Sequence, residues 1–392
     1  MKKALAAIVL AMLAAALAFA LLAGADDGKG GLRSGDDGGP FTFAAYGDAP
    51  YGTTPTDTAE FQATPAFVDA VNHDNKVKLV LHVGDIHSGK QYCTFGYDQS
   101  IYDLWTKFKD PLVYTPGDNE WTDCHKSGEG GNVQADGSYV DYANGDPVAN
   151  LGLIRQIFFS NAGHTLGDHD RRVLSQAQAF DPAHPDDAQY VENVMWEQSH
   201  VLFVTINLPG GSNNDADVWY GASTATGEQT QEAQLRTAAD LRWLDAAFKQ
   251  ASADHMSAVV IGLQADMWDL DGKPVTHLSN YEQFVSDIAT NTTSFAKPVL
   301  LLNGDSHVYR SDNPLVAGAP CVTEPSSGAL ATTCPTDDYP AHPGYNVPNF
   351  HRIVVHGSTF PLEYLRISVN TERPPAASPT SFGPFSWERV QP

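Results

Sequence analysis

Short apolar runs alternate along the chain with segments in which apolar residues recur every three to four positions. The runs predict buried β-strands, and the recurring spacing predicts helices that cover a sheet. The predicted strands are residues 41–46, 78–83, 112–115, 201–207, 257–263, 298–303, 351–355 and 362–369. The predicted helices are residues 61–72, 100–108, 233–250 and 281–290. This alternation predicts an α/β fold.

Other stretches of the chain depart from the alternation. Residues 26–40 are mostly glycine and aspartate, which predicts a flexible linker. The folded domain is predicted over residues 41–370, with an insertion around 125–187 that is rich in Gly, Asp and His and contains one helix near 151–159. Residues 371–392 are rich in proline and predict an extended C-terminal tail.

Residues 1–25 have the pattern of a secretory signal. Lys2 and Lys3 precede an apolar run that ends in Ala23-Gly24-Ala25, a small-residue cleavage site. If it is not cleaved, the run of roughly 20 residues is long enough to anchor the protein in a membrane. Cleavage is the favoured alternative, and it predicts a protein that is secreted or located in the periplasm or cell envelope.

Charge and cysteine content agree with export. The chain carries 47 acidic and 23 basic residues, a net charge of −24 that makes nucleic acid and anionic membranes poor partners. No sequence feature indicates a specific protein partner. The four cysteines fall into two pairs, Cys93 with Cys124 and Cys321 with Cys334, and neither spacing is that of a CxxC site. Two disulfides with these pairings are predicted, although four cysteines allow three connectivities.

Four predicted strands are followed by a glycine and an aspartate. The pairs are Gly47-Asp48, Gly84-Asp85, Gly117-Asp118 and Gly304-Asp305. Glycine allows a sharp turn as the chain leaves a strand, and the carboxyl ends of strands are where α/β proteins place their sites. Carboxylates that converge there raise one another's pKa unless a cation lies between them. The alternative, that each aspartate caps the next helix, explains one pair better than all four.

The ordered fragments resemble the motifs of the calcineurin-like metallophosphoesterases, which read D-x-H, G-D, G-N-H-E, a lone His and G-H-x-H. The fragments are Tyr46-Gly47-Asp48, Val83-Gly84-Asp85, Pro116-Gly117-Asp118-Asn119-Glu120 and Asn303-Gly304-Asp305-Ser306-His307. The resemblance covers roughly residues 41–310. It implies a two-layer β-sandwich flanked by helices, and a two-metal site that hydrolyses phosphate esters.

Several motif positions depart from the family pattern. Pro50 stands in place of the first-motif His, and Asp118-Asn119 stands in place of the third-motif Asn-His. Gln264 stands at the lone-His position, and Asp305 replaces the first His of the last motif. Nearly every imidazole has therefore become an oxygen donor.

Carried over position by position, the resemblance implies two divalent cations. The ligands would be Asp48, Asp85 and His307 for the first, and Asp85, Asp118, Gln264 and Asp305 for the second, with Asp266 as a spare ligand. Because carboxylate and amide oxygens suit hard cations, Mg²⁺, Mn²⁺ or Ca²⁺ is expected in preference to Zn²⁺ or iron.

Other residues near the motifs are candidates for the chemistry. His87 is a candidate general acid, and Asn119 is a candidate donor of a hydrogen bond to developing charge. Tyr51 and Arg310 are candidate substrate-binding residues, Arg310 through its planar guanidinium. The plainer alternatives are a surface-loop histidine for His87, a packing tyrosine for Tyr51 and an acid-paired arginine for Arg310.

These features predict an exported metal-dependent phosphoesterase that hydrolyses phosphate mono- or diesters, small or surface-bound, with metal-activated water. The alternative is a non-catalytic relative that keeps a cation and acts as a ligand-binding protein. The loss of the third-motif His at Asn119 favours this alternative. The sequence does not separate these functions from hydrolysis of another ester or of a nucleotide.

Overall fold

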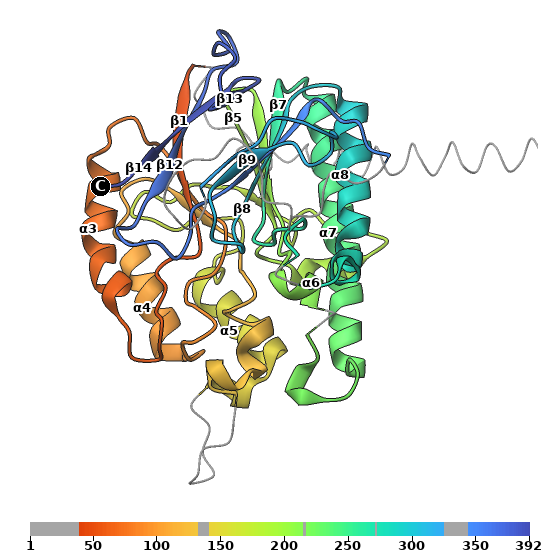
Figure 1. Ribbon diagram of the computed structural model, residues 1–392. Helices are drawn as coiled ribbons and strands as arrows, with labels where there is room; N and C mark the ends of the chain where they lie inside the picture. Colours follow the sequence, from red (N-terminus) through yellow and green to blue (C-terminus); the bar gives the residue numbers. More distant parts are fainter. Residues whose placement is uncertain (1–38, 132–140, 215–216, 271–272, 325–343) are drawn as a thin grey trace, which may run out of the picture.

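Two β-sheets pack face to face in this protein, with helices on both outer faces (Figure 1). The computed structural model describes residues 39–131, 141–214, 217–270, 273–324 and 344–392. The predicted α/β class, a two-layer sandwich flanked by helices, is confirmed. The predicted signal segment, nearly all of the linker and Cys334 lie outside the described residues. Within those residues, no helix combines the length and the apolar character that crossing a bilayer requires.

The first sheet has the strand order β13-β14-β12-β1-β2-β3. Its strands are β1 (Phe41–Tyr46), β2 (Val80–His82), β3 (Leu112–Tyr114), β12 (Tyr364–Val369), β13 (Ser381–Phe382) and β14 (Phe385–Val390). β1 pairs in parallel with β2 on one side and antiparallel with β12 on the other. The segment predicted as an extended tail contains β13 and β14, and β14 pairs with β12 along its whole length, so these residues are part of the sheet.

The second sheet has the order β10-β9-β11-β8-β7-β6-β5-β4. Its strands are β4 (Leu174–Ser175), β5 (Val194–Gln198), β6 (Val201–Thr205), β7 (Ala258–Gly262), β8 (Val299–Asn303), β9 (Arg310–Asp312), β10 (Val322–Thr323) and β11 (Phe350–Val354). The central strands β6, β7, β8 and β11 are mutually parallel. Parallel strands covered on both faces read as continuous apolar runs, which is why the sequence pattern predicted them.

The helices form the two outer layers, α3, α4 and α5 on the first sheet and α7 and α8 on the second (Figure 1). The helices are α3 (Ala59–His73), α4 (Phe95–Trp105), α5 (Pro147–Phe158), the short α6 (Gly210–Asn214), α7 (Gly227–Ala253) and α8 (Glu282–Phe295). α5 is the helix expected in the insertion. It begins where the side chain of Asp146 accepts a hydrogen bond from the backbone N–H of Ala149, with proline at the first turn.

A central apolar layer holds the two sheets together. Phe43 of β1 contacts Phe203 of β6 edge to face at 5.5 Å, and both side chains are buried with Leu302 of β8. Burying one such side chain contributes about 1.5–3 kcal/mol. The packed interior therefore fixes the strand ends of one sheet against those of the other.

Candidate metal centre

The carboxyl ends of β1, β2 and β3 meet that of β8, and backbone groups connect the turns that follow. The N–H of Asp48 donates to the carbonyl of Gly84 at 2.9 Å, and that of Ala49 donates to the carbonyl of Asp85 at 3.1 Å. The N–H of Asp305 donates to Oδ1 of Asp48 at 2.8 Å. These strand ends therefore converge, as the sequence predicted.

Two glycines make room for the carboxylates. A Cβ on Gly117 would overlap Oδ1 of Asp85, so the third turn can pass the second only as glycine. The second is Gly210, in the turn after β6. A Cβ there would come within 2.5 Å of Oδ2 of Asp118 and 2.8 Å of Oδ1 of Asp305. The Pro209-Gly210-Gly211 turn was the signal that could have revealed this position.

Asp48, Asp85 and His307 form a group of possible metal ligands among the described residues. Their ligand atoms lie within 4.8 Å of one another. Asp48 is fully buried, and its Oδ2 has no hydrogen-bond partner among the described residues. Nε2 of His307 lies 3.6 Å from Oδ1 of Asp48. A buried, unpartnered carboxylate oxygen beside a second carboxylate and an imidazole fits a divalent cation.

The carboxylates of the site make one another harder to ionise. Burial raises the pKa of Asp85 well above its ordinary value, and the charges of Asp118, Glu120 and Asp48 raise it further. Burial likewise raises the pKa values of Asp48 and Asp305, and in both the charge of Asp118 adds to the shift. A cation between them would remove this penalty because it favours the ionised form of each.

Gln264 does not present the oxygen that a cation would need. Its Oε1 accepts a hydrogen bond from the backbone N–H of Gly210 at 2.5 Å. Its Nε2 donates to Asp85 at 3.2 Å and to Asp118 at 3.0 Å. Because a backbone N–H can only donate, the amide orientation is fixed. Gln264, predicted as a metal ligand, is in this arrangement a hydrogen-bond donor to two carboxylates.

Asp266, the spare ligand, is already paired. Its Oδ1 accepts a hydrogen bond from Arg352 at 2.5 Å, and its Oδ2 accepts one from Ser306 at 2.9 Å. Its backbone N–H donates to Oδ2 of Asp305 at 2.9 Å. Asp266 therefore supports Asp305 from behind. The group that remains for a second cation is Asp85, Asp118 and Asp305.

Tyr51 and Asn119 lie inside the site. The Tyr51 hydroxyl donates to Oδ2 of Asp85 at 2.6 Å and accepts from Nδ2 of Asn119 at 2.8 Å. Nδ2 of Asn119 also lies 3.1 Å from Oδ2 of Asp85. Burial and the nearby carboxylates raise the pKa of Tyr51 well above its ordinary value, so the phenol stays protonated. The packing role considered for Tyr51 does not account for these polar contacts.

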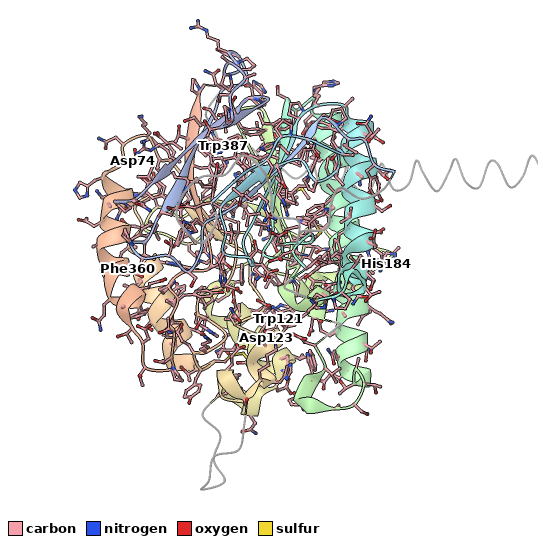
Figure 2. The ribbon with its side chains drawn as sticks, in the orientation of Figure 1. Asp74, Trp121, Asp123, His184, Phe360 and Trp387 are labelled. Carbon is pink, nitrogen blue, oxygen red and sulfur yellow. A yellow bond between two sulfur atoms is a disulfide. The ribbon has the colours of Figure 1, made fainter. Side chains whose placement is uncertain are left out.

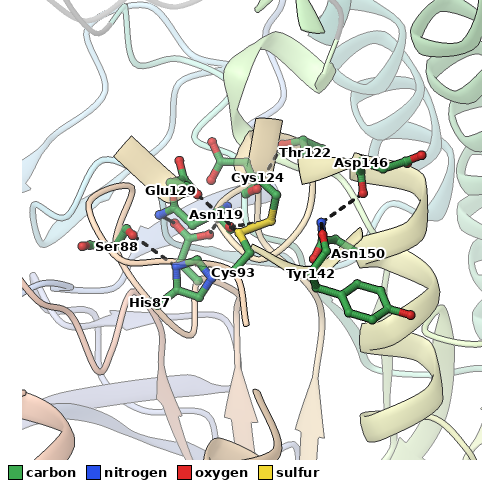
Figure 3. Close-up of a disulfide and its surroundings, with 12 residues drawn as sticks. His87, Ser88, Cys93, Asn119, Thr122, Cys124, Glu129, Tyr142, Asp146 and Asn150 are labelled. Atoms are coloured by element: carbon green, nitrogen blue, oxygen red, sulfur yellow. Dashed lines mark hydrogen bonds between the residues drawn. A yellow bond between two sulfur atoms is a disulfide. The ribbon is translucent and has the colours of Figure 1, made fainter. Parts of the chain in front are cut away.

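His87 does not contact the site. Its imidazole is fully buried, and its Nδ1 faces the carbonyl of Ser88 at 3.1 Å (Figure 3). Its ring also packs against Tyr97. Burial lowers its pKa to about 4. A neutral, enclosed imidazole cannot deliver a proton to a substrate in a cleft. The prediction of His87 as general acid is corrected for this reason, and so is its alternative as a surface residue.

Arg310 was predicted to bind substrate. It belongs to β9, is 4% exposed, and is not among the residues that line the cleft described below. The prediction that Arg310 binds substrate therefore has no support in the geometry.

The predicted Cys93–Cys124 disulfide is present and braces the third turn. It joins the loop after β2 to the short helical turn η1 (Thr122–His125), and both sulfur atoms lie beside the carbonyl oxygen of Asn119, at 3.3 and 3.6 Å (Figure 3). Glu120 supports the same turn, since its Oε1 accepts from the N–H of Gly117 at 2.7 Å and from the Tyr114 hydroxyl at 2.5 Å. Asn119 is thus held from two sides.

A polar cleft of about 290 Å³ opens beside the carboxylates. Asp118, Asp305 and His307 form part of its wall, and Lys126, Asp217 and Lys273 form another part. Lys126 is paired with Asp217 at 2.9 Å and also with Asp123, which Figure 2 shows beside Trp121 near the bottom of the view. The cleft can hold a small polar molecule next to the proposed cation ligands.

About half of the chain is similar to a known protein family. Residues 41–233 match the family model of the calcineurin-like phosphoesterases. No curated protein matches the chain. Among solved structures, the purple acid phosphatase PPD1 from seeds of yellow lupin (Lupinus luteus) aligns at 11% sequence identity and a TM-score of 0.41, covering 86% of this chain. This chain spans 50% of that phosphatase. Residues 41–233 therefore form a domain of the calcineurin-like phosphoesterase type.

Proposed function

We propose that this protein is an exported metal-dependent phosphoesterase that hydrolyses phosphate mono- or diesters. The observation that carries the proposal is the convergence of four carboxylates, those of Asp48, Asp85, Asp118 and Asp305, around a fully buried Oδ2 of Asp48 that has no partner in the described residues. The family match supports phosphoester hydrolysis as the reaction class.

Asp48, Asp85 and His307 would hold one cation. A second cation would be held by Asp85 with Asp118 and Asp305, and the last two carboxylates both lie beside Gly210. Apart from one imidazole, all of these ligands are carboxylates, which favours Mg²⁺, Mn²⁺ or Ca²⁺ over Zn²⁺ or iron.

Bound cations would supply an activated water and neutralise charge on the phosphate oxygens. The chain itself supplies orientation. Gln264 and Asn119 hold the carboxylate of Asp85 by amide hydrogen bonds, and Gln264 also holds Asp118. Nδ2 of Asn119 donates to the Tyr51 hydroxyl as well as to Asp85, and Asn119 does not line the cleft, so its role in this proposal is to orient Asp85.

The cleft supports a small-molecule phosphate ester as substrate. Its volume of about 290 Å³ leaves room for a phosphoryl group with a compact alcohol, and most of the described residues that line it are polar. Lys126 and Lys273 also line the cleft, and Lys126 is paired there with Asp123 and Asp217. A large apolar leaving group would have few contacts there.

Export is part of the proposal. It is supported by the signal-like pattern of residues 1–25 and by the buried Cys93–Cys124 disulfide, since disulfides persist in oxidising compartments. N-terminal sequencing of the protein recovered outside the cytoplasm should begin after residue 25. Recovery of the protein from the cytoplasm alone would contradict the proposal of export.

The activity is tested with chromogenic phosphate mono- and diesters in the presence of Mg²⁺, Mn²⁺, Ca²⁺ or Zn²⁺. We expect hydrolysis that chelator abolishes, and at least about a 100-fold loss in kcat for Asp85→Asn, the size seen when one group that stabilises transition-state charge is removed. Asp103→Asn, an exposed aspartate on α4, is the matched control and should turn over like wild type.

The second candidate function is a cation-dependent binding protein without turnover. It is favoured by Asn119 at the position of the family's third-motif His, and by the burial of His87. Phosphate esters that bind in the presence of cation but remain intact with all four metals would select this function over hydrolysis.

A further inference from the structure

The Tyr51 hydroxyl lies where loops from both sheets meet. It contacts Oδ2 of Asp85 at 2.6 Å, Nδ2 of Asn119 at 2.8 Å and Nε2 of His307 at 3.2 Å. Tyr51 follows β1, and its three partners follow β2, β3 and β8. One oxygen atom thus joins residues from four strand ends.

His307 is the proposed ligand that most needs such support. Its side chain is 38% exposed, whereas that of Asp48 is fully buried. The Tyr51 ring packs against the imidazole edge to face, with ring centres 4.8 Å apart and an angle of 84° between the planes. Nε2 is the imidazole nitrogen near Oδ1 of Asp48, at 3.6 Å, so the edge-to-face contact with Tyr51 holds the ring plane while Nε2 faces the site.

Asp85 receives its closest hydrogen bond from the same hydroxyl. The other donors to its Oδ2, Asn119 and Gln264, lie at 3.1 and 3.2 Å. Hydrogen bonds of this kind hold a carboxylate in the orientation that binds a cation. Less side-chain entropy is then lost when the cation binds.

We propose that Tyr51 is a positioning residue for the first cation: its hydroxyl orients Asp85, its ring restrains the imidazole of His307, and it is not itself a ligand. The inference rests on the proposed cation-dependent function, but it concerns cation binding, which is measured without turnover. Loss of an outer hydrogen-bonding partner typically lowers metal affinity 10–100-fold, with the ligand set unchanged.

The test is calorimetric titration of wild type and Tyr51→Phe with Mn²⁺, after removal of metal by chelation. We expect Kd for the variant to rise about 10–100-fold while the number of bound ions stays at the wild-type value. Tyr364→Phe is the matched control, because the Tyr364 hydroxyl also donates to a carboxylate, Asp74 Oδ2 at 2.8 Å, outside the site. The control should bind Mn²⁺ like wild type.

Three results would overturn the inference. They are an unchanged Kd in Tyr51→Phe, the loss of one bound ion, which would make Tyr51 a ligand, and a wild type that binds no Mn²⁺. A packing role would lower the melting temperature of the variant without changing Kd. Wild type that binds Mn²⁺ but hydrolyses no ester would contradict the proposed activity alone, whereas an active wild type with an unchanged Tyr51→Phe affinity would contradict this inference alone.

Discussion

Two buried groups of carboxylates lie next to each other in this protein, and only one of them is paired with a basic side chain. Behind the site, Arg352 is 1% exposed and donates to Asp266 and, with two nitrogens, to Asp312 at 2.9 and 2.7 Å. It also lies over the ring of Trp268. At the site itself, no lysine or arginine of the described ranges forms an ion pair with the four converging aspartates.

The difference shows which charges the chain balances by itself. A buried carboxylate is costly unless it is paired, so the Arg352 group is complete as folded and the strand-end group is not. The missing positive charge at the site is the physical basis for expecting cations there. Each prediction below tests the contrast between a group that is complete and one that needs a cation.

The largest effect is expected where the balanced group is broken. Arg352→Met keeps most of the side-chain volume but leaves Asp266 and Asp312 without their partner. We expect it to lower the free energy of unfolding by about 3–5 kcal/mol, measured by urea denaturation. Lys249→Met is the control, since Lys249 is 78% exposed and its pair with Asp245 is worth little. Equal stability of the two variants would show that Arg352 is not the balancing charge.

The second effect is stabilisation of the unbalanced group by metal. Mg²⁺ or Mn²⁺ at 100 times its Kd should raise the free energy of unfolding by about 2.7 kcal/mol, because the cation binds the folded state alone. Thermal denaturation with and without chelator measures it. Asp85→Asn should lose this increment and Asp103→Asn should retain it. If no divalent cation changes the stability of wild type, the strand-end group does not need a cation and the contrast between the two groups is wrong.

Replacing an aspartate with asparagine should change the free energy of unfolding in opposite directions in the two groups. In chelator, Asp118→Asn removes one of several repelling charges and should raise the free energy of unfolding by about 0.5–2 kcal/mol, as is common when a residue serves function at the expense of stability. Asp312→Asn should lower it, because it weakens the pair with Arg352. Chemical denaturation of both variants in one buffer decides the point. If both variants change the free energy of unfolding in the same direction, the two groups do not differ in charge balance.

The smallest effect concerns pH at another balanced carboxylate. Burial raises the pKa of Glu363, but hydrogen bonds and charge from His356 and Arg389 outweigh it and lower the pKa to about 2. A depressed pKa contributes stability that is present above the unfolded value near 4.3 and is lost as pH falls toward 2. Glu363→Gln should therefore flatten the stability profile between pH 5 and pH 2. A profile identical to wild type would count against this assignment.

The sequence revealed much of the fold because its signals are local. β1 begins and ends at the predicted residues, and the Gly-Asp pairs after β1, β2, β3 and β8 marked the strand ends that converge. By contrast, β5 and β14 were not predicted as strands. β5 has no clear alternation, and β14 depends on pairing with β12, a contact that local patterns do not encode.

The sequence indicated which residues of the site come together, but it did not indicate the hydrogen bonds among them. Asp48, Asp85 and His307 come together, and their motif spacing was enough to indicate it. The orientation of Gln264 was not predictable, since it depends on the N–H of Gly210 from a distant loop. The enclosure of His87 depends on tertiary packing against Tyr97, which no motif records.

The pairing of β1 with β12 has a consequence for the order of folding. The hydroxyls of Thr42 and Ser368 lie 3.1 Å apart although 326 positions separate them in the chain. Contacts between residues so distant in sequence form late, because the loop they close carries a large entropic cost. β1 carries the turn with Asp48 and Tyr51. A ribosome must therefore release nearly the whole chain before this turn is secured on both sides, and a nascent chain of 350 residues should bind no cation.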